Sequence, residues 1–167
     1  GLQRESPILR GSHPMRYLGE PSESEGVDFI LERARAGSPN DPLWVIGLGA
    51  FTDLASAILL DPSIADRVRF IAHARSEWTW PERSAQYNIG GDVTAARALL
   101  TSPAPLVWFD TGTQLTCPME VTEQRLAPLA ELGAWLHEYR FRRDYFQRPD
   151  KGFFDVGDIA WMIDASV

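Results

Sequence analysis

The sequence has little cysteine, no long apolar run and no excess of positive charge. Cys117 is the one cysteine among 167 residues and cannot form a disulfide within the chain, so we expect a reducing compartment, the cytoplasm. The longest apolar run, residues 43–51, is shorter than the ~20 residues of a membrane-spanning helix, so we expect no membrane partner. Because 23 acidic residues outnumber 16 basic ones, for a net charge of -7, we also expect no nucleic-acid partner.

The signatures of several hydrolase classes are missing too. The three histidines, His13, His73 and His137, are scattered along the chain, and none has metal-ligand spacing with another. No Gly-x-Ser-x-Gly turn and no Cys-His signature occur, so hydrolysis through a nucleophilic side chain has no support. The acidic net charge of -7 favours a small neutral or cationic ligand.

Short apolar runs alternate with helical segments along most of the chain. Residues 43–46, 68–72 and 105–109 have the continuous apolar character of strands buried on both faces. Helices are predicted between them, at residues 52–60 with Thr52 or Asp53 as cap, and from the cap residue Asp92 as far as residue 100. This order predicts an α/β fold with a mostly parallel, Rossmann-like open sheet flanked by helices, in one domain over residues 1–167.

Further elements are predicted outside this alternation. Ser22 and Ser24 offer helix caps, and apolar residues at helical spacing follow them as far as Gly37. A long helix is predicted at residues 123–145 and a short helical segment at residues 158–163. Ile8 and Leu9 have the character of a short strand.

Ligand sites in such sheets lie beyond the carboxyl ends of the strands, in the loops that lead into the helices. The loop after the first strand contains Gly47 and Gly49, as in a dinucleotide-binding turn. The third glycine of that pattern is absent, and no acidic residue ends the next strand to hold a ribose hydroxyl. A tight turn with another backbone role is therefore favoured, and NAD(P) binding is the weaker hypothesis.

The loop at residues 73–92 is long for an α/β connection, which is typical of a functional loop. It contains Trp78, Trp80 and Tyr87, whose faces can stack on a base or a sugar. Asn88 in the same loop can hydrogen bond to vicinal hydroxyls. The alternative is a surface flap whose aromatic residues pack for stability.

Two carboxylates, Asp155 and Asp158, precede the last helical segment. Asp158 can serve as a hard-cation ligand or as a helix N-cap, and the local pattern alone favours the cap. Upstream, four arginines alternate with aromatic residues, and against the acidic total a solvated helix end is favoured over a nucleic-acid patch. These arginines are Arg140, Arg142, Arg143 and Arg148.

Several stretches occur in the order found in one known family. They are PILRG at residues 7–11, GAFTDLA at 49–55, AQYNIGGD at 85–92, FDT at 109–111, and GDIA at 157–160 with Ile163 and Asp164 after it. In this order the chain resembles the inosine-uridine preferring nucleoside hydrolases, which are calcium-dependent N-ribosyl hydrolases built on a parallel α/β sheet. The resemblance covers most of the chain.

The resemblance implies roles for five positions. The backbone carbonyl of Leu48 and the carboxylate of Asp158 would coordinate Ca²⁺, and Asn88 would hold the ribose hydroxyls. Gln86 replaces a family glutamate that contacts the sugar, and hydrogen bonding to the sugar remains open to it. Gly157 replaces a histidine that protonates the departing purine in many members, which argues against purine-specific chemistry.

The family's acidic amino-terminal segment, D-x-D-x-x-x-D-D, has no counterpart in this sequence, and neither has its usual carboxyl-terminal part. That segment supplies most calcium ligands and the base that deprotonates water. One aspartate cannot hold an ion that takes about 6 to 8 oxygen ligands. We therefore expect no catalytic residue among these 167 residues, which alone should be inactive, and we expect them to form the central part of a longer chain.

The function predicted for the complete protein is hydrolysis of the N-glycosidic bond of ribonucleosides by a calcium-activated water, in purine or pyrimidine salvage. The alternative is a non-catalytic module that binds ribose or a nucleoside. Both hypotheses give a small-molecule partner, and both leave open the preference between purines and pyrimidines and the assembly into a homo-oligomer. Both require Leu48, Asn88 and Asp158 around one cleft.

Overall fold

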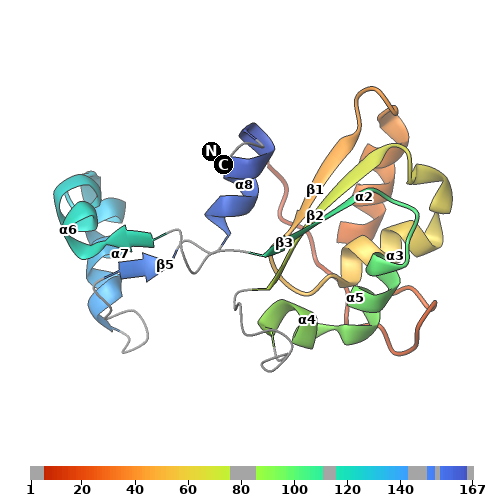
Figure 1. The fold of residues 1–167 in the computed structure, drawn as a ribbon, viewed down its shortest axis with the longest axis horizontal. Coiled ribbons are helices and arrows are strands. Elements are labelled where there is room, and N and C mark those ends of the chain that lie inside the picture. The colour runs from red at the N-terminus through yellow and green to blue at the C-terminus, as the bar shows by residue number, and fades with distance from the viewer. Residues whose placement is uncertain (1–5, 76–85, 111–115, 143–149, 153–154, 165–167) are drawn as a thin grey trace. The chain divides into compact units, whose positions relative to one another are not determined.

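The computed structural model describes residues 6–75, 86–110, 116–142, 150–152 and 155–164. The chain divides into two units, unit 1 (Gly1–Asp110) and unit 2 (Thr111–Val167). Among the described residues each unit has its own β-sheet, with three strands in unit 1 and two in unit 2. Figure 1 labels the helices and strands.

The sheet of unit 1 is parallel throughout. Its strands β1 (Leu43–Gly47), β2 (Val68–Arg75) and β3 (Leu106–Asp110) lie in the order β1-β2-β3. Gly47 pairs with Ala72, and His73 pairs with Phe109, so all three strands end at the same edge. The predicted parallel α/β sheet is confirmed, and the strand predicted at residues 68–72 continues to Arg75 with an irregularity in its pairing after His73.

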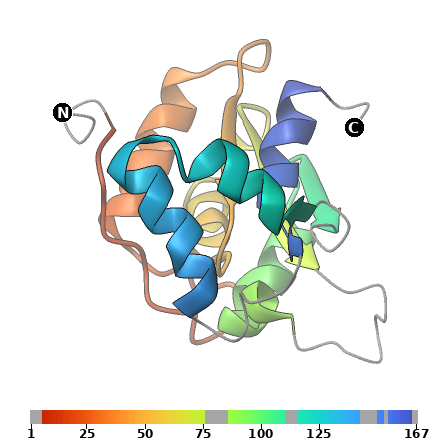
Figure 2. The ribbon, with the colours of Figure 1, turned by 90° about the vertical axis from the view of Figure 1, so that its left-hand side faces the viewer.

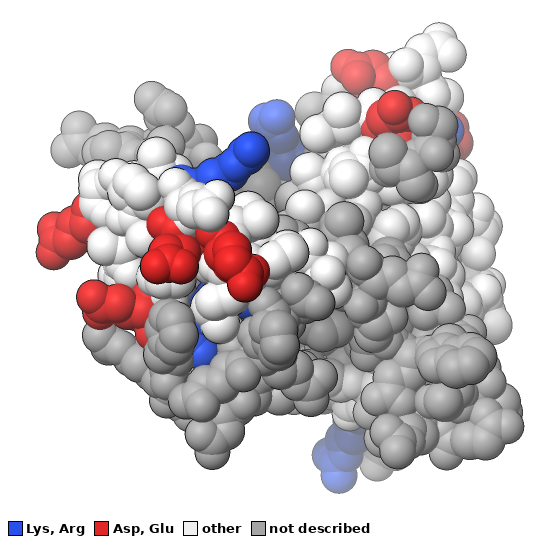
Figure 3. All heavy atoms as spheres, turned by 60° about the vertical axis from the view of Figure 1, so that its left-hand side comes forward, with Lys and Arg blue, Asp and Glu red and all other residues white. Residues whose placement is uncertain are grey.

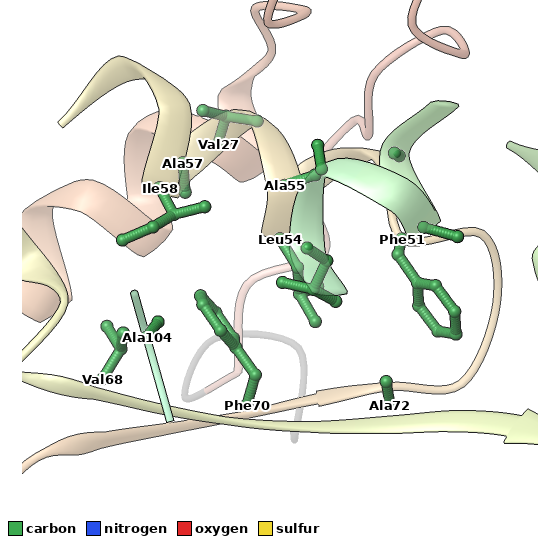
Figure 4. Close-up of a cluster of buried hydrophobic side chains, with 14 of the residues drawn as sticks. Val27, Phe51, Leu54, Ala55, Ala57, Ile58, Val68, Phe70, Ala72 and Ala104 are labelled. Atoms are coloured by element: carbon green, nitrogen blue, oxygen red, sulfur yellow. The ribbon is translucent and has the colours of Figure 1, made fainter. Parts of the chain in front are cut away.

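The described helices of unit 1 pack on the side of the sheet that carries Val68, Phe70 and Ala72 of β2. The helices are α2 (Glu25–Ala36), α3 (Thr52–Leu60), α4 (Tyr87–Gly91) and α5 (Val93–Leu100), with a short 3-10 turn η1 (Pro62–Ile64). Val68, Phe70 and Ala72 of β2 point toward Ile58 of α3 and Val27 of α2, and all five side chains are buried (Figure 4). Burial of this apolar layer, at about 25 cal/mol per Å², fixes the helices on the sheet.

The starts of α2 and α5 follow the predicted capping chemistry. Of the two serines considered for α2, Ser24 is the cap, and its hydroxyl accepts from the Val27 N–H at 3.1 Å. The carboxylate of Asp92 caps α5 by accepting from the Ala95 N–H at 2.8 Å. Such caps satisfy N–H groups that the first turn of a helix leaves without a partner.

The cap predicted for α3 is wrong. This helix begins after Phe51, and no side chain accepts a hydrogen bond from its first turn. Both predicted cap residues bind elsewhere: the Thr52 hydroxyl donates to Asp92 at 2.7 Å, and the Asp53 carboxylate accepts from the Ser12 N–H at 2.8 Å. Tertiary hydrogen bonds therefore replace the local cap.

Residues 6–24, called the strap below, have no helix or strand. The short strand predicted at Ile8 and Leu9 is wrong, and the Ile8 side chain is 83% exposed. The backbone of the following residue pairs with the start of α2 instead of with a strand: the Arg10 N–H donates to the Glu25 carboxylate at 3.2 Å, and the Arg10 carbonyl accepts from the Gly26 N–H at 3.0 Å.

Among its described residues, unit 2 contains a small antiparallel sheet and four helical segments. β4 (Thr116–Pro118) pairs with β5 (Asp150–Gly152). A helical turn α6 (Met119–Val121) leads into a π-helical segment η2 (Thr122–Leu126), which is followed by α7 (Ala130–Arg142) and, later, α8 (Val156–Ile163). Figure 2 shows how the chain bends between η2 and α7.

The single long helix predicted at residues 123–145 is wrong, because it is broken at residues 127–129. Pro128 has no N–H to continue a helical ladder, and its ring disfavours helical backbone in the preceding residue. Ala130 then adopts a positive φ of 50°. After the break, Gly133 lies against the Leu126 carbonyl oxygen, where a Cβ atom would collide with that oxygen.

A buried arginine joins three segments of unit 2, namely α7, η2 and β4. The Arg140 guanidinium donates to the Thr122 hydroxyl at 2.9 Å and to the backbone carbonyls of Cys117 and Pro118 at 3.3 and 3.4 Å. The Thr122 hydroxyl also lies 3.0 Å from Nδ1 of His137. The prediction of a solvated helix end is therefore wrong for Arg140, which is 6% exposed.

The charges exposed on α6, η2 and α7 are mainly acidic. The acidic side chains gather on one face in Figure 3. The exposed ones on these three segments are Glu120, Glu123, Glu131 and Glu138. Within the described ranges, no helix combines the length and the apolar character required to cross a membrane.

Candidate functional site

The loop between β1 and α3 occupies the carboxyl edge of the unit 1 sheet. Leu48, the first residue after β1, is 44% exposed, whereas Phe51 at the end of the loop is fully buried. The Phe51 ring lies against Trp108 of β3, with 5.6 Å between the ring centroids. A Cβ atom on Gly47 would come within 3.1 Å of both Leu54 and Phe51, so a larger residue here would require these side chains to shift by a few tenths of an ångström. The buried Phe51 thus anchors a loop whose first residues face solvent.

Asn88 lies on α4 and is tied to the end of the neighbouring strand β2. Its Nδ2 group donates to the backbone carbonyl of His73 at 2.8 Å, and both residues are buried. This hydrogen bond fixes the orientation of the amide, because the carbonyl can only accept. The Oδ1 atom, at the other end of the amide, is a hydrogen-bond acceptor held in a defined position.

Gln86 and Tyr87 flank this asparagine at the start of α4. Gln86 is the N-cap of the helix, and its Oε1 atom accepts from the Ile89 N–H at 2.8 Å. The Nε2 group of the same amide remains a donor by its chemistry. The Tyr87 side chain is 89% exposed, so its ring does not pack for stability as the flap hypothesis requires. Trp78 and Trp80 lie outside the described residues.

Two contacts join α4 to the loop that follows β1. Gly91 is so close to Ala50 that a Cβ atom added to it would lie 3.0 Å from the Ala50 Cβ. Two residues after Ala50 and one residue after Gly91, the Thr52 hydroxyl donates to the Asp92 carboxylate at 2.7 Å. Within unit 1 the structure therefore brings the loop of Leu48 and the helix of Asn88 together.

Asp158 belongs to unit 2, in the first turn of α8. The N-cap of this helix is Asp155, and Asp155 makes no side-chain cap bond, so the prediction that Asp158 is the N-cap is wrong. Asp158 is buried and Asp155 is exposed. One carboxylate oxygen of Asp155 lies within 4.8 Å of one carboxylate oxygen of Asp158. Paired carboxylates of this kind are donors of the type that hard cations prefer.

Sequence reasoning missed two tertiary ties around this edge. The Asp92 carboxylate accepts from the Met15 N–H at 2.8 Å in addition to Thr52 and Ala95. The Asp53 carboxylate accepts from Ser12 and from the Ser24 hydroxyl at 3.3 Å. Both aspartates stand at helix starts in the sequence, and a signal for their long-range partners is absent from the local pattern.

Comparisons with known proteins bear on the family and the fold of this chain. The sequence profile described as "Inosine-uridine preferring nucleoside hydrolase" matches residues 2–165. A plant nucleoside hydrolase, PpNRh1, superposes with a TM-score of 0.69 at 19% identity, over 99% of this chain and 52% of that one. A purine-preferring ribonucleoside hydrolase from Gardnerella vaginalis gives 0.67 at 22% identity, over 86% and 48%. The chain spans about half the length of these two proteins. A search of curated proteins gave no match of comparable significance.

Proposed function

From the membership of this chain in the inosine-uridine preferring nucleoside hydrolase family, we propose that it provides the ribose-facing part of a nucleoside hydrolase. The complete protein would hydrolyse the N-glycosidic bond of ribonucleosides. Both solved structures named above are hydrolases of nucleosides, and their likeness to this chain supports the fold. The substrate class comes from the family.

The single observation that carries this proposal is the orientation of Asn88. Its amide is locked by the carbonyl of His73 at 2.8 Å, at the carboxyl edge of a parallel sheet. A ribose hydroxyl can donate to Oδ1 of Asn88, and the Nε2 group of Gln86 can donate to a second sugar oxygen. The exposed ring of Tyr87 lies between them in the sequence and offers a face for the sugar or the base.

The family also implies a calcium ion, and the donors proposed for it are the Leu48 carbonyl and the Asp158 carboxylate. The chemistry of these donors fits, because Ca²⁺ binds carboxylates and backbone carbonyls. Their number does not complete a site that takes about 6 to 8 oxygens. Asp155 adds a second carboxylate near Asp158. When bound, calcium would lower the pKa of a coordinated water.

The 167 residues alone are proposed to be inactive, and they remain predicted to form one domain within a longer chain. Ribosyl transfer passes through an oxocarbenium-like state, which needs a base for the water as well as clamped hydroxyl groups. Asn88 and Gln86 supply the clamp, and no residue of this chain is proposed as the base. Gly157, at the place of the family histidine, offers no proton to a departing purine.

Calorimetric titration of the chain with D-ribose tests this proposal. We expect binding that Asn88→Ala weakens about 10-fold, because one oriented hydrogen bond contributes on the order of 1 kcal/mol. Asn40→Ala removes an exposed asparagine from the turn at residues 38–41 and should leave the affinity unchanged. Absence of ribose binding, or equal affinity for Asn88→Ala and wild type, would contradict the proposal.

A non-catalytic ribose-binding module is the second candidate. The engagement of Gln86 Oε1 in capping α4 favours it, because the family glutamate at this position contacts the sugar. Release of free base from inosine or uridine by a longer protein that contains these residues would exclude this candidate, whereas binding without release would support it. We further propose a cytoplasmic location, on the single cysteine, and a role in purine or pyrimidine salvage, with no nucleic-acid or membrane partner.

A further inference from the structure

We propose that Gly91 and Asp92 are positioning residues that hold the Leu48 loop against helix α4, so that the Leu48 carbonyl and Asn88 face the same ligand. This inference rests on the proposed function, and it concerns residues that touch no ligand themselves. Thr52 lies four positions after Leu48, and Asp92 lies four positions after Asn88. The contacts between the two segments therefore lie two to four positions along the chain from the groups that would bind the sugar and the cation.

The first contact is steric. Gly91, the last residue of α4, lies against Ala50, and a Cβ atom at position 91 would be 3.0 Å from the Ala50 Cβ and 3.7 Å from its Cα. Two methyl groups cannot occupy this space without a shift of a few tenths of an ångström, because packed carbon atoms lie at about 3.5 to 4.0 Å. Glycine at position 91 thus sets how closely the helix approaches the loop.

The second contact is a buried hydrogen bond. The Asp92 Oδ2 atom accepts from the Thr52 hydroxyl at 2.7 Å and from the Met15 N–H at 2.8 Å, while Oδ1 accepts from the Ala95 N–H. Asp92 is 4% exposed. A buried carboxylate held by three donors has one orientation, so it fixes Thr52, and with it the end of the loop, relative to α5.

These contacts act on binding because recognition of a small sugar depends on the separation of its partner groups. A displacement of about 1 Å between a hydrogen-bond acceptor and the neighbouring carbonyl is enough to lose an oriented interaction. Asn88 is anchored to β2, and Leu48 follows β1, so the sheet alone spaces the strand ends. The loop and the helix are spaced by Gly91 and Asp92.

A pair of matched glycine substitutions tests the steric contact. Gly90→Ala places a methyl group where nothing lies within 4 Å, whereas Gly91→Ala places it against Ala50. Both changes add the same helix propensity to α4. We expect ribose affinity a few-fold weaker for Gly91→Ala, because the methyl group requires a shift of a few tenths of an ångström, and unchanged affinity for Gly90→Ala. The double variant Gly91→Ala with Ala50→Gly removes the opposing methyl group and should restore the affinity.

A second pair separates positioning by Asp92 from its role as a helix cap. Asp92→Ser keeps a hydroxyl that can cap α5 but cannot reach Thr52 and Met15. Thr52→Val removes the hydroxyl that donates to Asp92 and leaves the cap intact. We expect both variants to weaken ribose binding by a similar factor. The core variant Ile64→Val, chosen to lower thermal stability to a comparable extent, should leave the affinity at the wild-type value.

Nuclear magnetic resonance of the unliganded chain tests the inference without ribose. If wild type does not bind ribose, the proposed function fails, but this measurement still tests the positioning role of Gly91 and Asp92. We expect Gly91→Ala and Thr52→Val to shift the amide resonances of residues 48–52 and the side-chain amide of Asn88. For Gly90→Ala the shifts should stay within α4. Unchanged resonances at residues 48–52 in both Gly91→Ala and Thr52→Val, or loss of affinity without rescue by Ala50→Gly, would overturn the inference.

Discussion

Each unit of the molecule contains a buried charged side chain that is held by several hydrogen bonds, Asp92 in unit 1 and Arg140 in unit 2, and these two charges are of opposite sign. In unit 1 the Asp92 carboxylate, 4% exposed, accepts hydrogen bonds from Met15, Thr52 and Ala95. In unit 2 the Arg140 guanidinium, 6% exposed, donates to the Thr122 hydroxyl and to backbone carbonyls. A buried charge is costly unless hydrogen bonds satisfy it, and both units satisfy it largely with groups from the backbone.

The difference between the units lies in the distance along the chain that each charge spans. Asp92 joins residues that are 77 and 40 positions away, and Arg140 joins residues 18 to 23 positions away. The carboxylate therefore organises the tertiary structure around the candidate site, whereas the guanidinium joins a helix to the short segment before it. Substitution of Asp92 should accordingly affect a larger part of the structure than substitution of Arg140.

The largest effect is expected for Asp92→Ala. The change removes a helix cap and leaves the Met15 N–H and the Thr52 hydroxyl buried without an acceptor, so the free energy of unfolding should fall by about 3 kcal/mol. Urea denaturation measures this loss. Asp66→Ala is the control, because the Asp66 side chain is 62% exposed. Equal stability of the two variants would show that the three hydrogen bonds of Asp92 contribute little.

Arg140→Ala should cost less, on the order of 2 kcal/mol, because its partners are fewer residues away and solvent can reach them when the end of α7 frays. Hydrogen exchange should show the loss of protection in α7 and η2, and little change in α3 and α5. Arg125→Ala removes an exposed arginine of the same unit and should leave the exchange rates unchanged. Loss of protection across unit 1 in Arg140→Ala would show that the hydrogen bonds of Arg140 also stabilise unit 1.

A smaller effect of opposite sign is expected at the break before α7. Ala130 has a φ of 50°, a conformation that costs an alanine about 1 kcal/mol and a glycine almost nothing. Ala130→Gly should therefore stabilise unit 2 by about 1 kcal/mol. The same substitution at Ala127, where φ is -55°, should destabilise it. Thermal unfolding distinguishes the two, and destabilisation by both would argue against left-handed strain at Ala130.

The smallest effect concerns a partly buried carboxylate of unit 1. Hydrogen bonds from Ser63, and then from Arg35, hold the pKa of Asp61 below its usual value of 3.8. Because the pKa of Asp61 is lower in the folded state, its ionised carboxylate stabilises the fold at pH values above 3.8. This contribution is lost as the pH falls through the folded-state pKa. Asp61→Asn should thus lower Tm slightly at pH 7 and leave it unchanged at pH 2. A difference in Tm that persists at pH 2 would point to packing instead of charge.

Much of unit 1 could be predicted because its signals are local. Apolar runs marked the three strands, and Ser24 and Asp92 marked the helices that they cap. The order of strands and helices then required a parallel sheet, and the carboxyl edge of that sheet gave the loop of Leu48 and the loop at residues 73–92, which contains Asn88, as candidate site elements. Helix α4 within that second loop was not predicted. These inferences depend on neighbours within a few residues, which a sequence displays directly.

The errors arose where distant partners outweigh local pattern. Thr52 and Asp53 have the chemistry of helix caps, yet they bind Asp92 and the strap. Ile8 and Leu9 have strand propensity without a strand to pair with. The helix predicted at residues 123–145 kept its apolar spacing across Pro128, but the missing N–H broke it. Arg140 was assigned to solvent because its partners in β4 could not be identified from its neighbours in the sequence.

The hydrogen bond between Met15 and Asp92 also bears on the order in which unit 1 folds. During synthesis at the ribosome Met15 emerges 77 residues before its acceptor, and closing so long a loop is slow compared with forming α2 or α3. The strap therefore has to wait for the start of α5 before it can dock. Its amides should gain protection last in refolding, and the nascent chain presents this segment to chaperones and proteases until Asp92 has been made.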